Sequence, residues 1–317
     1  MRTSTKVILS AAGLAAAAFT GLSFFVAHNI MHGRRQTLDE AIAWQKAHYD
    51  ISWFEPLEKT EYTIRSYDDY ELHVMLCKNP QPTGKYVIIT HGYTDNRYGM
   101  LKYMKMYLDA GFNCIIYDLR GHGENEPTFC TYSIREAKDL HVLIEDTRRR
   151  YPDLTALGLH GESLGAATAA AVLKYDQDLA FAVADCGFSE IMNVLKTSMR
   201  YSHLPEWFVW PASIAVKLRC GYYPPNMRPV DSLKDNHVPM LFIHGENDTF
   251  IVPDNSRDMQ KATAGYSELY IIPDAKHANS VLTHPDLYNE YLQGFLQHCG
   301  VGQRDVRLCP TQGLSRS

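Results

Sequence analysis

The chain has few of the features that mark a disulfide-bonded or metal-binding protein. Its seven cysteines are odd in number, scattered through 317 residues, and no two of them form a Cys-x-x-Cys pair. This pattern predicts neither a disulfide framework nor a zinc site, and no metal is expected. Cys114 and Cys186, within or just past expected strands, are predicted to be small buried hydrophobic residues. Internal repeats and low-complexity tracts are also absent, which excludes repeat architectures.

Basic residues are slightly outnumbered by acidic ones. Lysine and arginine number 31 against 36 aspartates and glutamates, which gives a formal net charge of −5. Nothing resembles the basic stripe of a nucleic-acid-binding protein, so no nucleic acid is expected as a partner. The composition suits an enzyme domain, and about 260 residues after the N-terminal segment can bury one large core or a core with a small insertion.

The N-terminus contains the one long uncharged stretch, which covers residues 7–27. As a helix it would rise about 30 Å, the thickness of a membrane's hydrocarbon core, whereas signal peptides have apolar cores of about 7–15 residues. We therefore expect residues 1–30 to be a membrane anchor. The many alanines leave a cleaved signal peptide, and hence a secreted protein, as the alternative. Basic residues on both flanks do not fix the side of the membrane. A chain that starts near Thr37 is expected to be soluble and active.

The remainder alternates short apolar runs with helical segments of about 10–20 residues, a pattern typical of βαβ units. It predicts an α/β fold with a doubly wound, mainly parallel sheet and helices on both faces. Residues 31–60 are expected to be a linker with a short helix, residues 61–300 the main domain, and residues 301–317 a polar tail. Apolar helical spacing in an insertion at about 188–235 predicts a small cap.

Residues 161–165 read Gly-Glu-Ser-Leu-Gly and lie between an expected strand and a helix of small residues. This strand-turn-helix context is typical of a nucleophile elbow, a strained turn that raises one hydroxyl above the edge of the sheet. Here that hydroxyl belongs to Ser163. Glycines at 161 and 165 allow the backbone to approach itself closely.

Polar motifs follow four further expected strands: His-Gly-Tyr at 91–93, Asp-Leu-Arg-Gly-His-Gly at 118–123, His-Gly-Glu-Asn-Asp at 244–248 and Asp-Ala-Lys-His at 274–277. In a doubly wound sheet, reactive residues gather at the carboxyl ends of the strands. These motifs are therefore expected at one edge of the sheet with Ser163.

Together the five motifs resemble those of the α/β-hydrolase superfamily of serine hydrolases. Within it, the chain resembles the membrane-anchored bacterial branch related to lysophospholipases, monoacylglycerol lipases and serine aminopeptidases, over residues 61–298. The resemblance implies a Ser163–Asp248–His277 triad in the family's chain order, with the cap before the strand that carries the acid. It also implies an oxyanion hole made by the backbone amides of Tyr93 and Leu164, and no cofactor.

The residue types fit this chemistry. A serine hydroxyl is a poor nucleophile at neutral pH and needs a histidine base, which an aspartate orients and stabilises when charged. The competing acids for this role are Asp118, which is expected to brace the loop of Arg120, and Asp254, which is expected to cap a helix.

Four further histidines lie near strand ends, and structural hydrogen bonds or packing are expected for them: His91, His122, His160 and His244.

Two tryptophans in the predicted cap, Trp207 and Trp210, are candidate substrate-binding residues. They could line an acyl or aryl pocket, dock on the membrane surface or simply fill the core of the cap.

The sequence thus predicts a serine hydrolase that cleaves carboxylic esters, thioesters or lipid acyl esters through an acyl-enzyme. The expected partners are a small-molecule or lipid ester and the membrane, the latter through the N-terminal helix. One alternative is a serine peptidase or amidase of the aminopeptidase type, and another is a non-catalytic binding protein that kept the fold. Neither the substrate nor the oligomeric state follows from the sequence.

Overall fold

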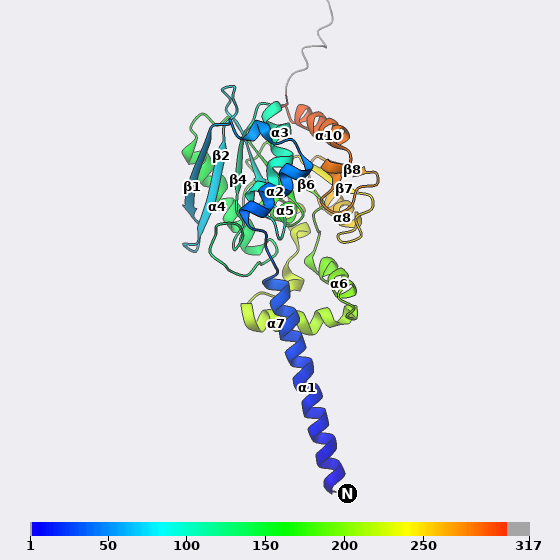
Figure 1. The fold of residues 1–317 in the computed structure, drawn as a ribbon. Helices are drawn as coiled ribbons and strands as arrows, with labels where there is room; N and C mark the ends of the chain where they lie inside the picture. The colour runs from blue at the N-terminus through cyan, green and yellow to red at the C-terminus, as the bar shows by residue number, and fades with distance from the viewer. Residues whose placement is uncertain (1, 303–317) are drawn as a thin grey trace, which may run out of the picture.

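The computed structural model describes the backbone of residues 2–302 and the side chains of residues 11–302. An eight-stranded sheet in the order β1-β2-β4-β3-β5-β6-β7-β8 runs through the main domain (Figure 1). Strands β3 to β8 are parallel to one another, whereas β2 is antiparallel to both of its neighbours, β1 and β4. The fold class predicted from the sequence is confirmed. The strands are β1 (Lys59–Arg65), β2 (Glu71–Cys77), β3 (Lys85–Thr90), β4 (Asn113–Tyr117), β5 (Ala156–Glu162), β6 (Phe181–Asp185), β7 (Met240–Gly245) and β8 (Ser267–Ile272).

Helices cover both faces of the sheet because side chains alternate along each strand. On β3, Ile88 belongs to one buried cluster, whereas Val87 and Ile89 belong to the other. Helices α4, α5 and α8 close the first cluster, and α3 and α10 close the second. The helices of the main domain are α3 (Leu101–Asp109), α4 (Ile134–Arg150), α5 (Leu164–Val172), α8 (Asp254–Ala262), α9 (Ser280–Thr283) and α10 (Pro285–His298).

The N-terminal segment forms two helices. Helix α1 (Arg2–Met31) includes Ala11–Met31, which is long and apolar enough to cross a membrane by length and composition. Its outer part projects away from the domain (Figure 1), whereas Ala27 and Met31 near its end are 1% exposed. Helix α2 (Leu38–His48) begins with a capping box, a reciprocal pair of hydrogen bonds between Thr37 and Glu40.

Between β6 and β7 the chain leaves the sheet and builds a helical cap, in the region where the sequence predicts one. Its longer helices are α6 (Ile191–Tyr201) and α7 (Val209–Cys220), and α7 crosses the inner end of α1 (Figure 1). Short 3₁₀ helices complete the described structure: η1 (Ser52–Phe54), η2 (Arg97–Met100), η3 (Glu206–Phe208), η4 (Pro224–Asn226) and η5 (Pro229–Leu233). The tail expected at 301–317 lies outside the described residues from residue 303 onward.

Candidate active site

Ser163 stands on a sharp turn between β5 and α5, with a φ of +54° and a ψ of −110°. Non-glycine residues rarely adopt a positive φ, so the turn is strained in the way a nucleophile elbow requires. The two motif glycines are both needed. A Cβ at Gly161 would lie 2.1 Å from the carbonyl oxygen of Gly165, and a Cβ at Gly165 would lie 2.0 Å from that of Thr90.

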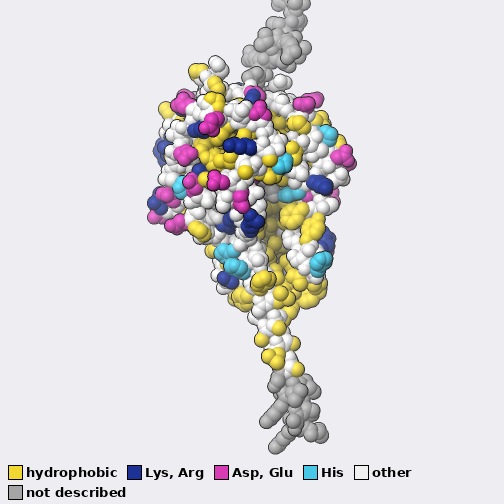
Figure 2. Space-filling view, in the orientation of Figure 1, with side chains coloured by type: hydrophobic (Ala, Val, Ile, Leu, Met, Phe, Trp, Pro, Cys, Tyr) yellow, Lys and Arg dark blue, Asp and Glu magenta, His cyan; other side chains and the backbone are white. Residues whose placement is uncertain are grey.

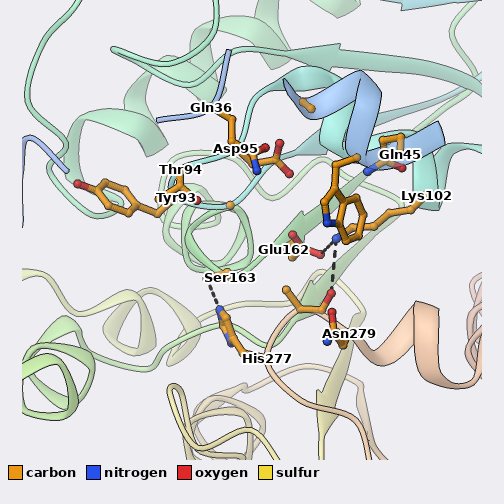
Figure 3. Close-up of a pocket in the computed structure, with 14 residues that line it drawn as sticks. Gln36, Gln45, Tyr93, Thr94, Asp95, Lys102, Glu162, Ser163, His277 and Asn279 are labelled. Atoms are coloured by element: carbon orange, nitrogen blue, oxygen red, sulfur yellow. Dashed lines mark hydrogen bonds and ion pairs between the residues drawn. The ribbon is translucent and has the colours of Figure 1, made fainter. Parts of the chain in front are cut away.

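The structure brings Ser163, His277 and Asp248 into one hydrogen-bonded line. The Oγ of Ser163 is 3.0 Å from Nε2 of His277 (Figure 3), and Nδ1 of the same imidazole is 2.6 Å from Oδ2 of Asp248. The three side chains come from the ends of β5, β7 and β8, which are adjacent or near-adjacent in the parallel part of the sheet. The geometry is that of a nucleophile, a base and an orienting acid.

Asp248 is held as a buried carboxylate. Its Oδ1 accepts the backbone N–H groups of Phe250 and Ile251, each at 2.9 Å, and Nε2 of His244 lies 3.2 Å from its Oδ2. Burial alone would raise the pKa of Asp248, but the hydrogen bonds from His244, His277 and the backbone outweigh it and lower the pKa to about 2. Asp248 is therefore ionised throughout the pH range near neutrality.

The competing acids have other partners. Asp118 forms a buried ion pair with Arg97 and accepts the N–H of Glu124 at 3.0 Å, so it braces the loop after β4. Arg120 itself pairs instead with Asp139. Asp254 is exposed at the start of α8 and pairs with Arg257 at 2.9 Å.

The competing histidines also have structural partners. The Nε2 of His91 accepts the N–H of Leu119 at 2.8 Å, and burial lowers the pKa of His91 to about 4. The remaining contacts join Nδ1 of His122 to the carbonyl of Arg120 (2.9 Å), Nδ1 of His160 to the hydroxyl of Tyr107 (2.9 Å), and Nδ1 of His244 to the hydroxyl of Ser256 (2.7 Å).

Tyr93 and Leu164, whose backbone amides are the expected oxyanion donors, line a cavity together with Ser163. The loop after β3 passes so close that a Cβ at Gly92 would sit 3.5 Å from Cβ of Ser163. Within residues 2–302, neither of these N–H groups donates a hydrogen bond. Two unpaired donors next to a nucleophile can hold an oxyanion.

A buried polar network lies beneath the elbow, and sequence reasoning did not find it. Lys102 of α3 pairs with Glu162, and the hydroxyl of Tyr103 donates to Glu162 at 2.5 Å and contacts Asp185 at 2.9 Å. Burial opposes the charge of Lys102, but the carboxylates of Glu162 and Asp95 outweigh it and raise its pKa. The only sign of this network in the sequence is Glu162, an acidic residue next to the motif serine, at a position where an apolar residue would also pack.

Two cavities meet at Ser163. One, of about 620 Å³, runs between α1 and α6 and has no charged side chain among the described residues that line it. The other, of about 220 Å³, lies toward α2 and has a polar lining (Figure 3) that includes Gln45, Asp95 and Lys102. Gln45 is buried; its Nε2 donates to the carbonyl of Gly99 at 3.0 Å, while its Oε1 has no partner within the described part of the chain.

The structure does not place Trp207 and Trp210 in the predicted pocket. Their side chains are 58% and 49% exposed on the outer side of the cap, and neither lines a cavity at Ser163. The reason is the orientation of α7, which turns Val209 and Ala212 inward and Trp210 outward. Trp207 stacks on Phe19 of α1, with ring centroids 6.3 Å apart.

Comparison with known proteins places the chain in a family. A family described as serine aminopeptidase, S33, matches residues 81–210. The uncharacterized protein YqkD of Bacillus subtilis is 31% identical over 302 residues, which cover 92% of this chain and 98% of YqkD. With the fold and these matches, the chain belongs to the α/β-hydrolase superfamily, in the same family as YqkD.

Solved structures agree on the fold. The Pyrococcus furiosus esterase Pf2001 superposes with a TM-score of 0.66 at 24% identity, covering 76% of this chain and 91% of the esterase. An esterase from Exiguobacterium antarcticum has a TM-score of 0.57 at 17% identity, covering 75% of this chain and 100% of its own. The acylaminoacyl peptidase of Pyrococcus horikoshii has a TM-score of 0.58 at 16% identity, with 76% of this chain and 41% of the peptidase covered. At these identities the similarity concerns the fold.

Proposed function

We propose that the protein is a membrane-anchored serine hydrolase that cleaves acyl esters through an acyl-enzyme on Ser163. The observation that carries the proposal is the Ser163–His277–Asp248 line at the junction of an apolar and a polar cavity. An ester that combines a hydrocarbon chain with a polar alcohol fits such a junction, because each cavity matches one part of it.

The reaction follows from the geometry. Ser163 Oγ attacks the ester carbonyl carbon while its proton passes to Nε2 of His277, and the carbonyl oxygen becomes an oxyanion that the amides of Tyr93 and Leu164 stabilise. The carbon–oxygen bond to the alcohol then breaks, and the departing oxygen takes the proton from His277. Water repeats the sequence on the acyl-enzyme and releases the acid. Asp248 keeps the imidazole oriented and stabilises its charged form.

The polar cavity is suited to the alcohol part of the ester. The unpartnered Oε1 of Gln45 can accept a hydrogen bond from a hydroxyl group of the leaving alcohol. A peptidase that holds a free amine is the second candidate, favoured by the carboxylates Asp95 and Glu162 in the same cavity and by the serine aminopeptidase match. Glu162 is already paired with Lys102, however, and the ammonium group of Lys102 lines the same cavity, where it would repel the charged amine of a peptide substrate. The ester reading is therefore the stronger.

Substrate class is tested with p-nitrophenyl octanoate, p-nitrophenyl acetate and leucine p-nitroanilide. We expect kcat/KM for the octanoate to exceed that for the acetate at least tenfold, because each buried methylene contributes about 0.8 kcal/mol. The anilide is expected to give no turnover above a Ser163→Ala control. Efficient cleavage of the anilide with weak turnover of both esters would instead establish the peptidase.

The inner end of α1 supports an uncleaved anchor over a signal peptide. Val26, Ala27, Ile30 and Met31 are buried against the domain, so cleavage after this helix would uncover the surfaces that they cover. The carbonyl of Met31 also accepts the N–H of Cys130 at 3.0 Å. A signal peptide that is cleaved off would not be expected to contribute side chains to the hydrophobic core.

The anchor is expected to hold the full chain in the membrane fraction through a carbonate wash, because the apolar part of α1 favours the hydrocarbon core. Intact-mass measurement of the purified protein is expected to show a chain that still contains the first residues. A mature chain that begins beyond residue 15 would contradict the anchor and favour a secreted protein.

A further inference from the structure

One face of the anchor helix lines the apolar cavity at Ser163. The α1 residues on the cavity wall are Leu22, Phe25, Val26, Asn29 and Ile30. Their spacing of three and four residues defines a single stripe along the helix, about 12 Å long at 1.5 Å per residue. The helix thus has a second role beside anchoring, because a continuous face of it lines the cavity of the candidate active site.

A matching stripe on α6 forms the opposite wall. Its members also recur at intervals of three and four residues: Ile191, Val194, Leu195, Ser198 and Met199. Phe188 and Leu164 line the cavity as well, and Ser163 lies among its lining residues. Two facing helices whose stripes are apolar except for Asn29 and Ser198 make an elongated groove, a shape suited to an extended hydrocarbon chain.

The inner end of this groove is fixed to the loop that carries a candidate oxyanion donor. The hydroxyl of Tyr93 accepts the N–H of Gly33 at 2.7 Å and donates to the carbonyl of Ile30 at 3.3 Å. The hydroxyl of Tyr132 donates to the same carbonyl. The register of α1 relative to Ser163 is therefore set by hydrogen bonds as well as by packing.

The other end of the groove opens where apolar side chains face outward. Leu22 and Phe25 line the groove and yet are 41% and 65% exposed. Beside them the cap presents a second exposed apolar stripe: Trp210, Ile214 and Leu218 recur every four residues along α7. Figure 2 shows hydrophobic side chains gathered where α1 leaves the domain, while most charged side chains are scattered over the rest of the visible face. A lipid bilayer around α1 would meet this surface and the groove mouth together.

We propose that the C-terminal part of α1 is one wall of the acyl-binding site, and that the acyl chain of a membrane-resident ester enters the groove between α1 and α6 directly from the bilayer. The inference rests on the proposed role of Ser163 as the nucleophile. It also changes the expectation for a chain that starts near Thr37. Such a chain lacks this wall, so it is expected to lose its preference for long acyl chains and to expose the surface that α1 covers.

The test uses the full chain in phospholipid nanodiscs and two fluorophosphonates, one with a methyl and one with a decyl chain. Leu22→Trp narrows the groove, whereas Leu14→Trp makes the same change two turns farther out, where the 73% exposed Leu14 is not among the residues that line the groove. We expect Leu22→Trp to slow labelling of Ser163 by the decyl probe at least tenfold more than labelling by the methyl probe. Leu14→Trp is expected to leave both rates within twofold. Ser198→Trp, on the α6 wall, is expected to reproduce the effect of Leu22→Trp.

A decyl rate in Leu22→Trp within twofold of the unmodified protein would overturn the proposal, and so would an equal loss with both probes. Equal effects of Leu22→Trp and Leu14→Trp would overturn it too, because they would trace the loss to membrane insertion. The labelling rates do not depend on ester turnover. If no ester is hydrolysed but decyl labelling depends on Leu22, the acyl-binding role of the groove is supported and the esterase proposal is wrong. If esters are hydrolysed but labelling is independent of Leu22, the reverse holds.

Discussion

Replacing Ser163 by alanine is expected to reduce kcat for p-nitrophenyl octanoate by at least about 10⁴-fold, because no other group can form the acyl-enzyme. The fold should persist, since the serine hydroxyl makes one side-chain hydrogen bond, to His277. Steady-state turnover in detergent measures the effect, with circular dichroism to verify folding. Ser232→Ala, which removes a serine hydroxyl from η5 that lines neither cavity at Ser163, is the matched control and is expected to retain full activity.

A Ser163→Ala protein that is folded and keeps more than about a tenth of the turnover would show that the chemistry does not pass through this hydroxyl. The second cluster of buried polar groups, around Lys102 and Glu162, would then be the next place to look for it.

The second large effect is expected at the base and its acid. Asp248→Asn should lower kcat about 10⁴-fold, because an amide can stabilise the wrong tautomer of the His277 ring. His277→Ala should lower kcat by at least the same factor. The double variant should cost little more than the worse single one, since residues that act as a unit are not additive. The matched control is Asp254→Asn, which alters an exposed aspartate paired with Arg257 and should stay within twofold of the unmodified protein.

Strict additivity of the two losses would mean that Asp248 and His277 do not act together, against the 2.6 Å contact between them. A large loss in Asp254→Asn would move the role of the acid to that residue.

The sequence was sufficient to predict the sheet and to predict where the three residues of the candidate triad lie. Motifs at strand ends are local, and a parallel sheet brings the carboxyl ends of its strands to one edge whatever the loops between them do. Ser163, Asp248 and His277 could therefore be predicted to meet although 114 and 29 residues separate the bonded pairs. The strained turn at Ser163 also follows from local sequence.

The other parts of the candidate site could not be predicted from local sequence motifs. Over residues 11–27, helix α1 is largely apolar on every side, so its composition hides which face meets α6, and only tertiary packing selects Leu22 and Ile30 for the groove. Gln45 reaches the site because α2 packs on the loop after β3, a contact across 54 residues that no motif marks. Trp210 does not line the pocket for a similar reason: which face of α7 is buried depends on tertiary packing, including the contact of α7 with α1, and not on a local motif.

The most direct test of the account is to map the adduct of a fluorophosphonate on the full-length protein by tandem mass spectrometry of its peptides. The structure predicts one adduct, on Ser163, formed at a rate that falls sharply in His277→Ala. An adduct on a different residue, or no adduct under conditions that label other serine hydrolases in parallel, would contradict the assignment of Ser163 as the nucleophile.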